Sequence, residues 1–234
     1  MWHERLKQQD LIGDISEAVG LQLAQAGFIA RGGQIIDASI VMAPMQHQRG
    51  EENEAIKRGE TPGDWSASKR SQKDVDARWT KKHGKSYDGY KLHANTDRHW
   101  DFIRHAEVTV ASVNDTEVFE SILDETNTSK EVYADRGYAK HVRETELHVK
   151  GYRAQIQHKG TAGRAISEAQ KRRNRRIAKQ RAFGEHPFAR LAYMGGKHLR
   201  TIGLARARVV IGLKVITHNL LHLARLKYRG VVPA

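Results

Sequence analysis

Residues 34–41 (QIIDASIV) constrain this chain most, because they read as a buried strand that carries one carboxylate in its middle. Apolar and β-branched residues flank Asp37 on both sides, and Gly32 and Gly33 mark where the strand begins. A carboxylate in such a run is costly to bury unless a cation or a metal ion pairs with it. The first question is therefore what Asp37 is there to hold.

The charge of the chain is unevenly distributed. The 234 residues include 40 Lys and Arg against 27 Asp and Glu, a net charge of +13. Residues 159–229 hold 18 of the basic residues and only two acids, Glu168 and Glu185. Such a block indicates either a polyanionic partner, of which nucleic acid is the first candidate, or a basic helix surface that is simply exposed to solvent. Charge alone does not choose between the two.

Several classes of protein are excluded or disfavoured by composition. The chain has no cysteine, so it forms no disulfide and no thiolate metal site. No apolar run approaches the roughly 20 residues of a membrane span, and no apolar segment of a secretory signal follows Met1. We therefore expect an intracellular protein with no membrane partner.

The order of predicted elements favours an α/β fold. A helical segment over residues 1–30, with Asp14 as its N-cap, precedes the Asp37 strand. Residues 45–84 are polar and charged and predict an exposed, partly disordered insertion. A hairpin (87–95 and 102–110), a short helix capped by residues 114–116, a strand from 131, a helix over about 138–149 and a strand over 152–157 follow. A basic helix (165–182) and an amphipathic C-terminal helix complete a mixed sheet flanked by helices. The apolar stripe of this last helix is predicted to run through Val209, Leu213, Ile216, Leu220 and Leu223.

Three carboxylates are the candidate metal ligands. Asp37 lies in mid-strand, Asp135 at the end of a later strand, and Glu185 on the basic helix. Mg²⁺ and Mn²⁺ take oxygen ligands of this kind, and two ions about 4 Å apart support phosphodiester chemistry. The structural alternatives are a turn or cap role for Asp135 and an ion pair between Glu185 and Arg181.

Several motifs resemble those of bacterial insertion-sequence transposases of the DDE type, with the Tyr-Arg-Glu-Lys motif. Residues 36–44 resemble the first acidic motif, 89–93 the strand after the insertion, and 133–138 the second acidic motif. Residues 185–188, 194–196 and 200–207 look like the third. The resemblance extends from about residue 30 to the C-terminus.

The resemblance implies an RNase H-like fold over residues 31–228, with a flexible insertion at about 45–84. It implies that Asp37, Asp135 and Glu185 form the catalytic triad and bind Mg²⁺ or Mn²⁺, with two ions expected. It further implies cleavage of double-stranded DNA and strand transfer at element ends and targets, by a homo-oligomer assembled on DNA in the cytoplasm, at the nucleoid. Family members usually carry an additional N-terminal region, and residues 1–30 would be its tail.

The predicted DNA contacts come from the basic helix. Arg181, four residues before Glu185, matches the motif arginine and would contact a phosphate near the metals. The other expected backbone contacts are Lys171, Arg172, Arg173, Arg175 and Arg176.

Two departures from the motif motivate a second hypothesis. Ala178 and Ala192 stand where the family motif has tyrosine and lysine. The alternative is a truncated, catalytically silent transposase that binds DNA or oligomerises with a full-length one. A third possibility is a general RNase H-like nuclease, which would cleave without preference for element ends.

Overall fold

The computed structural model describes residues 11–82, 84–161, 163 and 165–233. The part of the predicted N-terminal helix before residue 11 lies outside these residues. The strands are β1 (Gln34–Met42), β2 (Arg78–Lys82), β3 (Lys85–Asp97), β4 (Ile103–Val110), β5 (Glu131–Ala134) and β6 (Arg153–Ile156). The α-helices are α2 (Leu11–Gln25), α3 (Gly50–Lys57), α4 (Ala67–Gln72), α5 (His141–Val149), α6 (Glu168–Arg181), α7 (Glu185–Tyr193) and α8 (Leu204–Tyr228).

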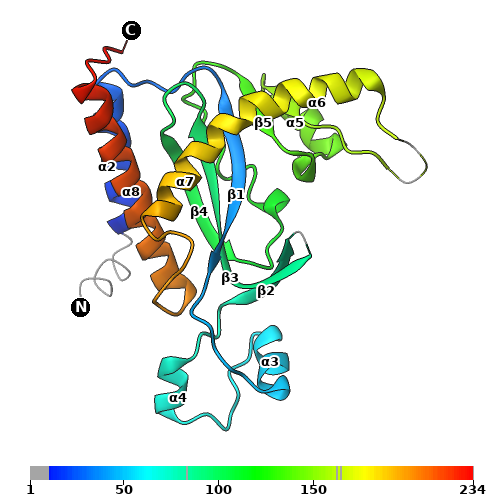
Figure 1. The fold of residues 1–234 in the computed structure, drawn as a ribbon, viewed down its shortest axis with the longest axis vertical. Helices are drawn as coiled ribbons and strands as arrows, with labels where there is room; N and C mark the ends of the chain where they lie inside the picture. The colour runs from blue at the N-terminus through cyan, green and yellow to red at the C-terminus, as the bar shows by residue number, and fades with distance from the viewer. Residues whose placement is uncertain (1–10, 83, 162, 164, 234) are drawn as a thin grey trace.

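The six strands form one mixed sheet in the order β2-β3-β1-β5-β6, with β4 paired to β3 (Figure 1). The contacts of β3 with β1, β2 and β4 are antiparallel. The contacts of β5 with β1 and β6 are parallel. The predicted α/β class, a mixed sheet flanked by helices, is therefore confirmed. Side chains of β1 alternate between the two faces, so Ile35 faces α6 while Ile36 faces the cluster under α5.

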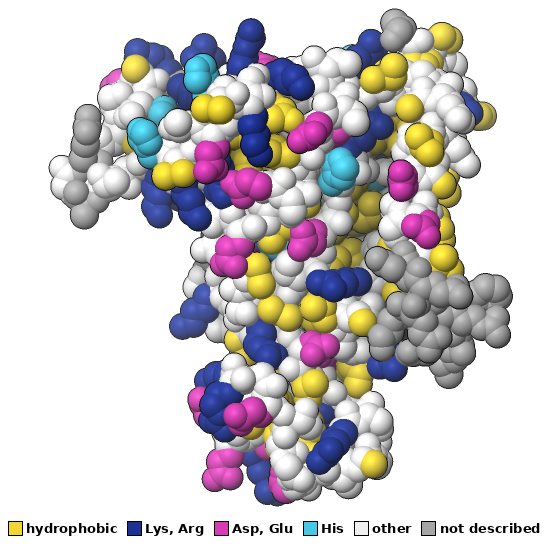
Figure 2. All heavy atoms as spheres, turned by 180° about the vertical axis from the view of Figure 1, so that it is seen from behind, with side chains coloured by type: hydrophobic (Ala, Val, Ile, Leu, Met, Phe, Trp, Pro, Cys, Tyr) yellow, Lys and Arg dark blue, Asp and Glu magenta, His cyan; other side chains and the backbone are white. Residues whose placement is uncertain are grey.

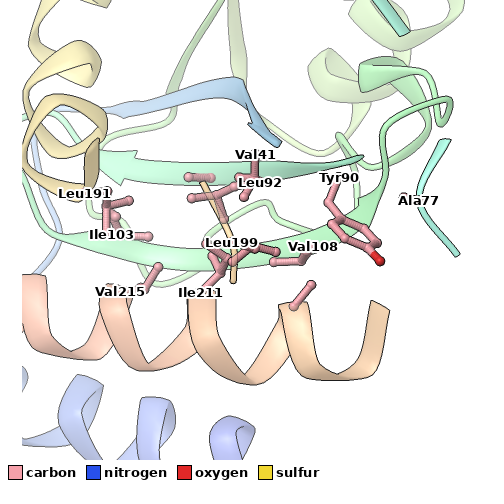
Figure 3. Packing of buried hydrophobic residues seen from close by; sticks show 12 residues of the cluster. Val41, Ala77, Tyr90, Leu92, Ile103, Val108, Leu191, Leu199, Ile211 and Val215 are labelled. Carbon is pink, nitrogen blue, oxygen red and sulfur yellow. The ribbon is translucent and has the colours of Figure 1, made fainter. Parts of the chain in front are cut away.

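The largest apolar cluster lies between the sheet and α8. Figure 3 shows Leu92 and Tyr90 of β3 and Val108 of β4 packed over Ile211 and Val215 of α8. The other side of α8 contacts α2, where Ile216 joins an apolar cluster with residues of α2. Helix α8 has the length and apolar composition of a membrane span, yet its place between β4 and α2 is that of a core helix.

Close packing explains one glycine of α8. A Cβ atom at Gly212 would lie 2.4 Å from Cγ2 of Ile12, so only glycine lets α2 approach this closely. The predicted stripe of α8 included Leu220, which is 41% exposed. The stripe facing the sheet runs instead through Ala207, Ile211 and Val215, because α8 is covered on two sides.

The predicted insertion contains ordered elements. Helices α3 and α4 project from the end of β1 as a small unit (Figure 1). Glu52 is buried at its centre, where Oε1 accepts hydrogen bonds from Nε1 of Trp65, 2.8 Å away, and from Nζ of Lys69. Trp65 thus joins α3 to the segment around α4 inside the insertion, whereas Trp79 on β2 is 57% exposed.

Two predicted helical features differ in the structure. Residues 115–117 form only a single 3₁₀ turn, because the apolar residues Val118, Phe119 and Ile122 are buried against the sheet instead of lining a helix. Asp14 lies inside α2 and does not cap it.

Candidate active site

Asp37 and Asp135 are brought side by side by the register of two parallel strands. Ile35 of β1 pairs with Tyr133 of β5, and each aspartate lies two residues further along its own strand direction. Because side chains alternate, both carboxylates share the face of Ile35 and Tyr133, which α6 covers through Ile177. The charge of Asp135 contributes to raising the pKa of Asp37, because the two carboxylates repel each other.

The carboxylate of Asp37 is held by one guanidinium and one backbone amide. Nη2 of Arg181 donates to Oδ2 at 2.9 Å, and the backbone N–H of Ala38 donates to Oδ1 at 2.8 Å. About a quarter of the Asp37 side chain remains exposed. Burial is the largest influence and raises the pKa of Asp37, while Arg181 and the Ala38 amide act in the opposite direction. Arg181 therefore supplies the cation that a carboxylate in this buried strand requires.

Asp135 ends β5 and caps the following 3₁₀ turn. Its Oδ1 accepts from the backbone N–H of Gly137 at 2.7 Å. A Cβ atom at position 137 would lie 2.8 Å from this oxygen, so the glycine leaves room for the carboxylate. Asp135 is therefore both a cap residue, as the structural alternative predicted, and a neighbour of Asp37.

Arg143 of α5 supports the loop that carries Asp135. It is buried, and its guanidinium donates to the carbonyl oxygens of Tyr138 at 2.9 Å and Thr116 at 2.5 Å and to Glu120 Oε1 at 2.7 Å. These bonds join the turn after β5 to the turn after β4. Sequence reasoning missed this residue, because its partners are contributed by two segments that are separate in the sequence.

Glu185 lies at the first position of α7, near the acidic pair but not within it. Its side chain is exposed. The prediction that it shares one helix with Arg181 was wrong, because α6 ends at Arg181 and a 3₁₀ turn (Ala182–Gly184) precedes α7. Arg181 accordingly contacts Asp37, and the alternative of an Arg181–Glu185 ion pair is not what the structure contains.

Gly184 fixes where Glu185 sits relative to β1. A Cβ atom at Gly184 would lie 2.7 Å from Cγ2 of Ile35, two residues before Asp37. The turn can approach the sheet this closely only without a side chain. This contact explains why position 184 is occupied by a glycine.

Gln157 completes the row of polar groups at the strand ends. It follows β6 at the position equivalent to Asp135, since Ala134 pairs with Ile156. Its Oε1 accepts from Nη1 of Arg181 at 3.4 Å. The sequence predicts Gln157 as the last residue of a strand over 152–157 and gives no sign of its contact with Arg181.

The donor set fits a hard divalent cation in part. Asp37 and Asp135 offer neighbouring carboxylate oxygens, and the repulsion between them is what a bound cation would relieve. Within the described ranges, however, no three His, Asp or Glu side chains lie close enough to hold one metal ion. Glu185 would therefore have to change its position or rotamer to join the pair.

The predicted DNA contacts on α6 fall into two groups. Arg173 donates to the carbonyl oxygens of Ile156 at 2.6 Å and Ala154 at 2.9 Å, and Lys171 pairs with Glu168 at 2.8 Å. Three further predicted contacts are exposed arginines that, together with Lys179, line an open depression of about 590 Å³. These arginines are Arg172, Arg175 and Arg176. Figure 2 shows Lys and Arg side chains gathered around the end of the molecule where α6 lies.

The family of this chain follows from comparison with known proteins. Residues 31–220 match the model of the transposase DDE domain. A relative from Neisseria meningitidis serogroup B, the transposase for insertion sequence element IS1106, is 29% identical over 225 residues, covering 94% of this chain and 75% of the relative. No solved structure gives a significant match. The chain belongs to the transposase DDE domain family.

Proposed function

We propose that this chain is an insertion-sequence transposase that cuts double-stranded DNA and joins the cut end to a target. The observation that carries the proposal is the facing pair Asp37 and Asp135, held on adjacent strands beneath a basic helix. The family match and the similarity to an insertion-sequence transposase support it. The expected site of action is the DNA of the cytoplasm.

The proposed roles follow from position. Asp37 and Asp135 would hold Mg²⁺ or Mn²⁺, and Glu185 is assigned as the third ligand from the first turn of α7. A pair of such ions supplies activation of an attacking oxygen and stabilisation of a leaving oxygen. Arg181 positions the phosphodiester at the acidic pair, since a guanidinium binds phosphate oxygens in a bidentate manner.

The exposed arginines of α6 bind the DNA backbone in this proposal. Arg172, Arg175 and Arg176 are exposed and line the open depression on α6, whereas Ile177 of the same helix is buried. Contacts of this kind neutralise phosphates and carry no sequence information. We assign the catalytic domain to residues 31–228 and propose that it acts as a homo-oligomer on DNA.

The arrangement of Arg181 and Glu185 supports a second candidate function. Arg181 neutralises Asp37 directly, and Glu185 stands apart from the acidic pair. A chain locked in this arrangement would bind DNA without cutting it. The two functions differ in one respect, namely whether divalent metal produces strand transfer.

Strand transfer of an oligonucleotide tests the proposal. Labelled duplexes copied from the DNA that flanks the gene are incubated with supercoiled plasmid and wild-type protein, with Mg²⁺ or with EDTA. Metal-dependent joining of the label to plasmid supports the transposase. Salt-dependent binding without joining under any metal supports the silent protein instead, and joining of unrelated duplexes at equal rate supports a nuclease without element preference.

A further inference from the structure

Lys197 lies in the loop between α7 and α8, and the backbone of this loop is tied to the end of β1. The carbonyl oxygen of Lys197 accepts from the backbone N–H of Met42 at 2.8 Å, and the N–H of Leu199 donates to the carbonyl of Met42 at 2.9 Å. The loop thus extends the sheet by an isolated bridge between Met42 and His198. Its backbone position is set by the sheet.

The ammonium group of Lys197 reaches the acidic face of β1. Nζ donates to Oγ of Ser39 at 2.8 Å, and Ser39 lies two residues beyond Asp37 on the same face. Burial, followed by the charge of Lys82 at the end of β2, lowers the pKa of Lys197. Lys82 also lowers the pKa of Asp37, so it lies within electrostatic range of both side chains.

Lys82 and Lys197 stand outside the ion pairs formed among the described residues. In the part of the chain that the structure describes, no carboxylate forms an ion pair with Lys82 or Lys197. The charge of Lys82 disfavours the ammonium form of Lys197, and an anion bound beside the two side chains would relieve this repulsion. Arg181 approaches Asp37 from α6, whereas this pair adjoins Ser39, further along β1. The acidic pair is therefore flanked by cations on two sides.

We propose that Lys197 and Lys82 form a phosphate-binding pair that holds the DNA strand beyond Asp37, on the Ser39 side of the acidic pair. The inference rests on the proposed function, because it takes the anion to be a DNA phosphate. Contacts along α6 secure the strand on one side of the reacting phosphate, and the lysine pair secures it on the other. Fixing a substrate on both sides limits its motion at the reacting group.

Lysine footprinting tests the contact without any need for catalysis. Wild-type protein is acetylated with acetic anhydride in EDTA, alone, with a short duplex DNA, or with excess inorganic phosphate, and modification is quantified by mass spectrometry. Lys197 and Lys82 are expected to be protected several-fold by DNA, while Lys227, exposed on the last turn of α8, reacts equally in all samples. Equal modification of Lys197 with and without DNA overturns the proposal. Protection by phosphate but not by DNA also overturns it, since it shows a site for the free ion.

Variants give a second readout. Lys197→Met is expected to reduce the slope of log binding constant against log salt concentration by about one unit, while Lys197→Arg and the control Lys227→Met keep the wild-type slope. An unchanged slope in Lys197→Met contradicts the proposal. Both measurements are made without metal, so absence of strand transfer in the wild type would refute the proposed activity while leaving this contact to be judged by its own results.

Discussion

Asp37 and Asp135 occupy equivalent positions on two adjacent parallel strands, because the register that pairs Ile35 with Tyr133 places each aspartate two residues further on. Two carboxylates so placed repel each other, and Arg181 compensates only one of them directly. Charge repulsion of this kind lowers stability in exchange for a site able to bind cations. The pair is thus expected to influence stability as well as activity.

Replacing Asp135 by asparagine should stabilise the protein at pH 8 by a few tenths to about 1 kcal/mol. The amide oxygen of Asn can still accept from the N–H of Gly137, while the charge that repels Asp37 is removed. A carboxyl group whose folded pKa is raised costs stability when it is ionised, so the gain should shrink as pH falls and Asp37 becomes protonated. Thermal unfolding at several pH values measures this. Asp64→Asn, at an exposed acid of the insertion, should show no gain, and a loss of stability in Asp135→Asn at pH 8 would contradict the account.

Replacing Arg181 by glutamine should destabilise the protein by about 1–2 kcal/mol at pH 8, because it leaves the carboxylate of Asp37 without its counterion. The figure is kept low because both side chains are partly exposed. The loss should diminish toward low pH, where Asp37 is neutral. Urea unfolding at two pH values compares Arg181→Gln with Arg175→Gln, an exposed arginine of the same helix. Equal stability of the two variants at pH 8 would show that the ion pair contributes nothing.

Replacing Gly184 by alanine should cost about 1–3 kcal/mol. The added methyl group would lie 2.7 Å from Cγ2 of Ile35 and would push the start of α7 away from β1. Metal-dependent cleavage should fall with it, since Glu185 moves with the turn. Gly50→Ala, in α3 with nothing within 4 Å, should be neutral or slightly stabilising. Wild-type stability and cleavage in Gly184→Ala would contradict the proposed packing constraint.

Replacing Arg143 by methionine should destabilise the protein by about 2–4 kcal/mol, because two backbone carbonyl groups and Glu120 lose their donor. The loop that carries Asp135 should also become more mobile, visible as faster amide exchange at Gly137. Arg153→Met removes an exposed arginine and serves as the control. A cost below about 0.5 kcal/mol, the range of ordinary surface substitutions, would contradict a supporting role for Arg143.

The strands and the two aspartates could be predicted from the sequence because their signals are local. The apolar run around Asp37 and the short run before Asp135 each mark a strand by composition alone, and the structure places β1 and β5 there. The parallel register that joins them depends on a pairing 98 positions apart, which no local pattern encodes.

The remainder of the site depends on tertiary contacts. The predicted end of the basic helix at residue 182 lies close to the end of α6, but the contact of Gly184 with Ile35 that follows has no local signal in the sequence. Lys197 reaches Ser39 across 158 positions. Arg173 was predicted from its charge to contact DNA, yet its guanidinium donates hydrogen bonds to backbone carbonyl groups of β6. Charge and periodicity identify the basic helix, and packing decides which of its side chains are available.

Metal-dependent nicking of supercoiled plasmid tests the central claim most directly, namely that Asp37, Asp135 and Glu185 act together on DNA. Wild type, Asp37→Asn, Asp135→Asn, Glu185→Gln and the control Glu168→Gln, which alters the other acid of the basic block, are compared at equal folded concentration with Mg²⁺, Mn²⁺ or EDTA. The account predicts nicking by wild type and Glu168→Gln only with metal, and a loss of at least about 100-fold in each of the other three. Wild-type rates in Glu185→Gln, or nicking that persists in EDTA, would contradict it.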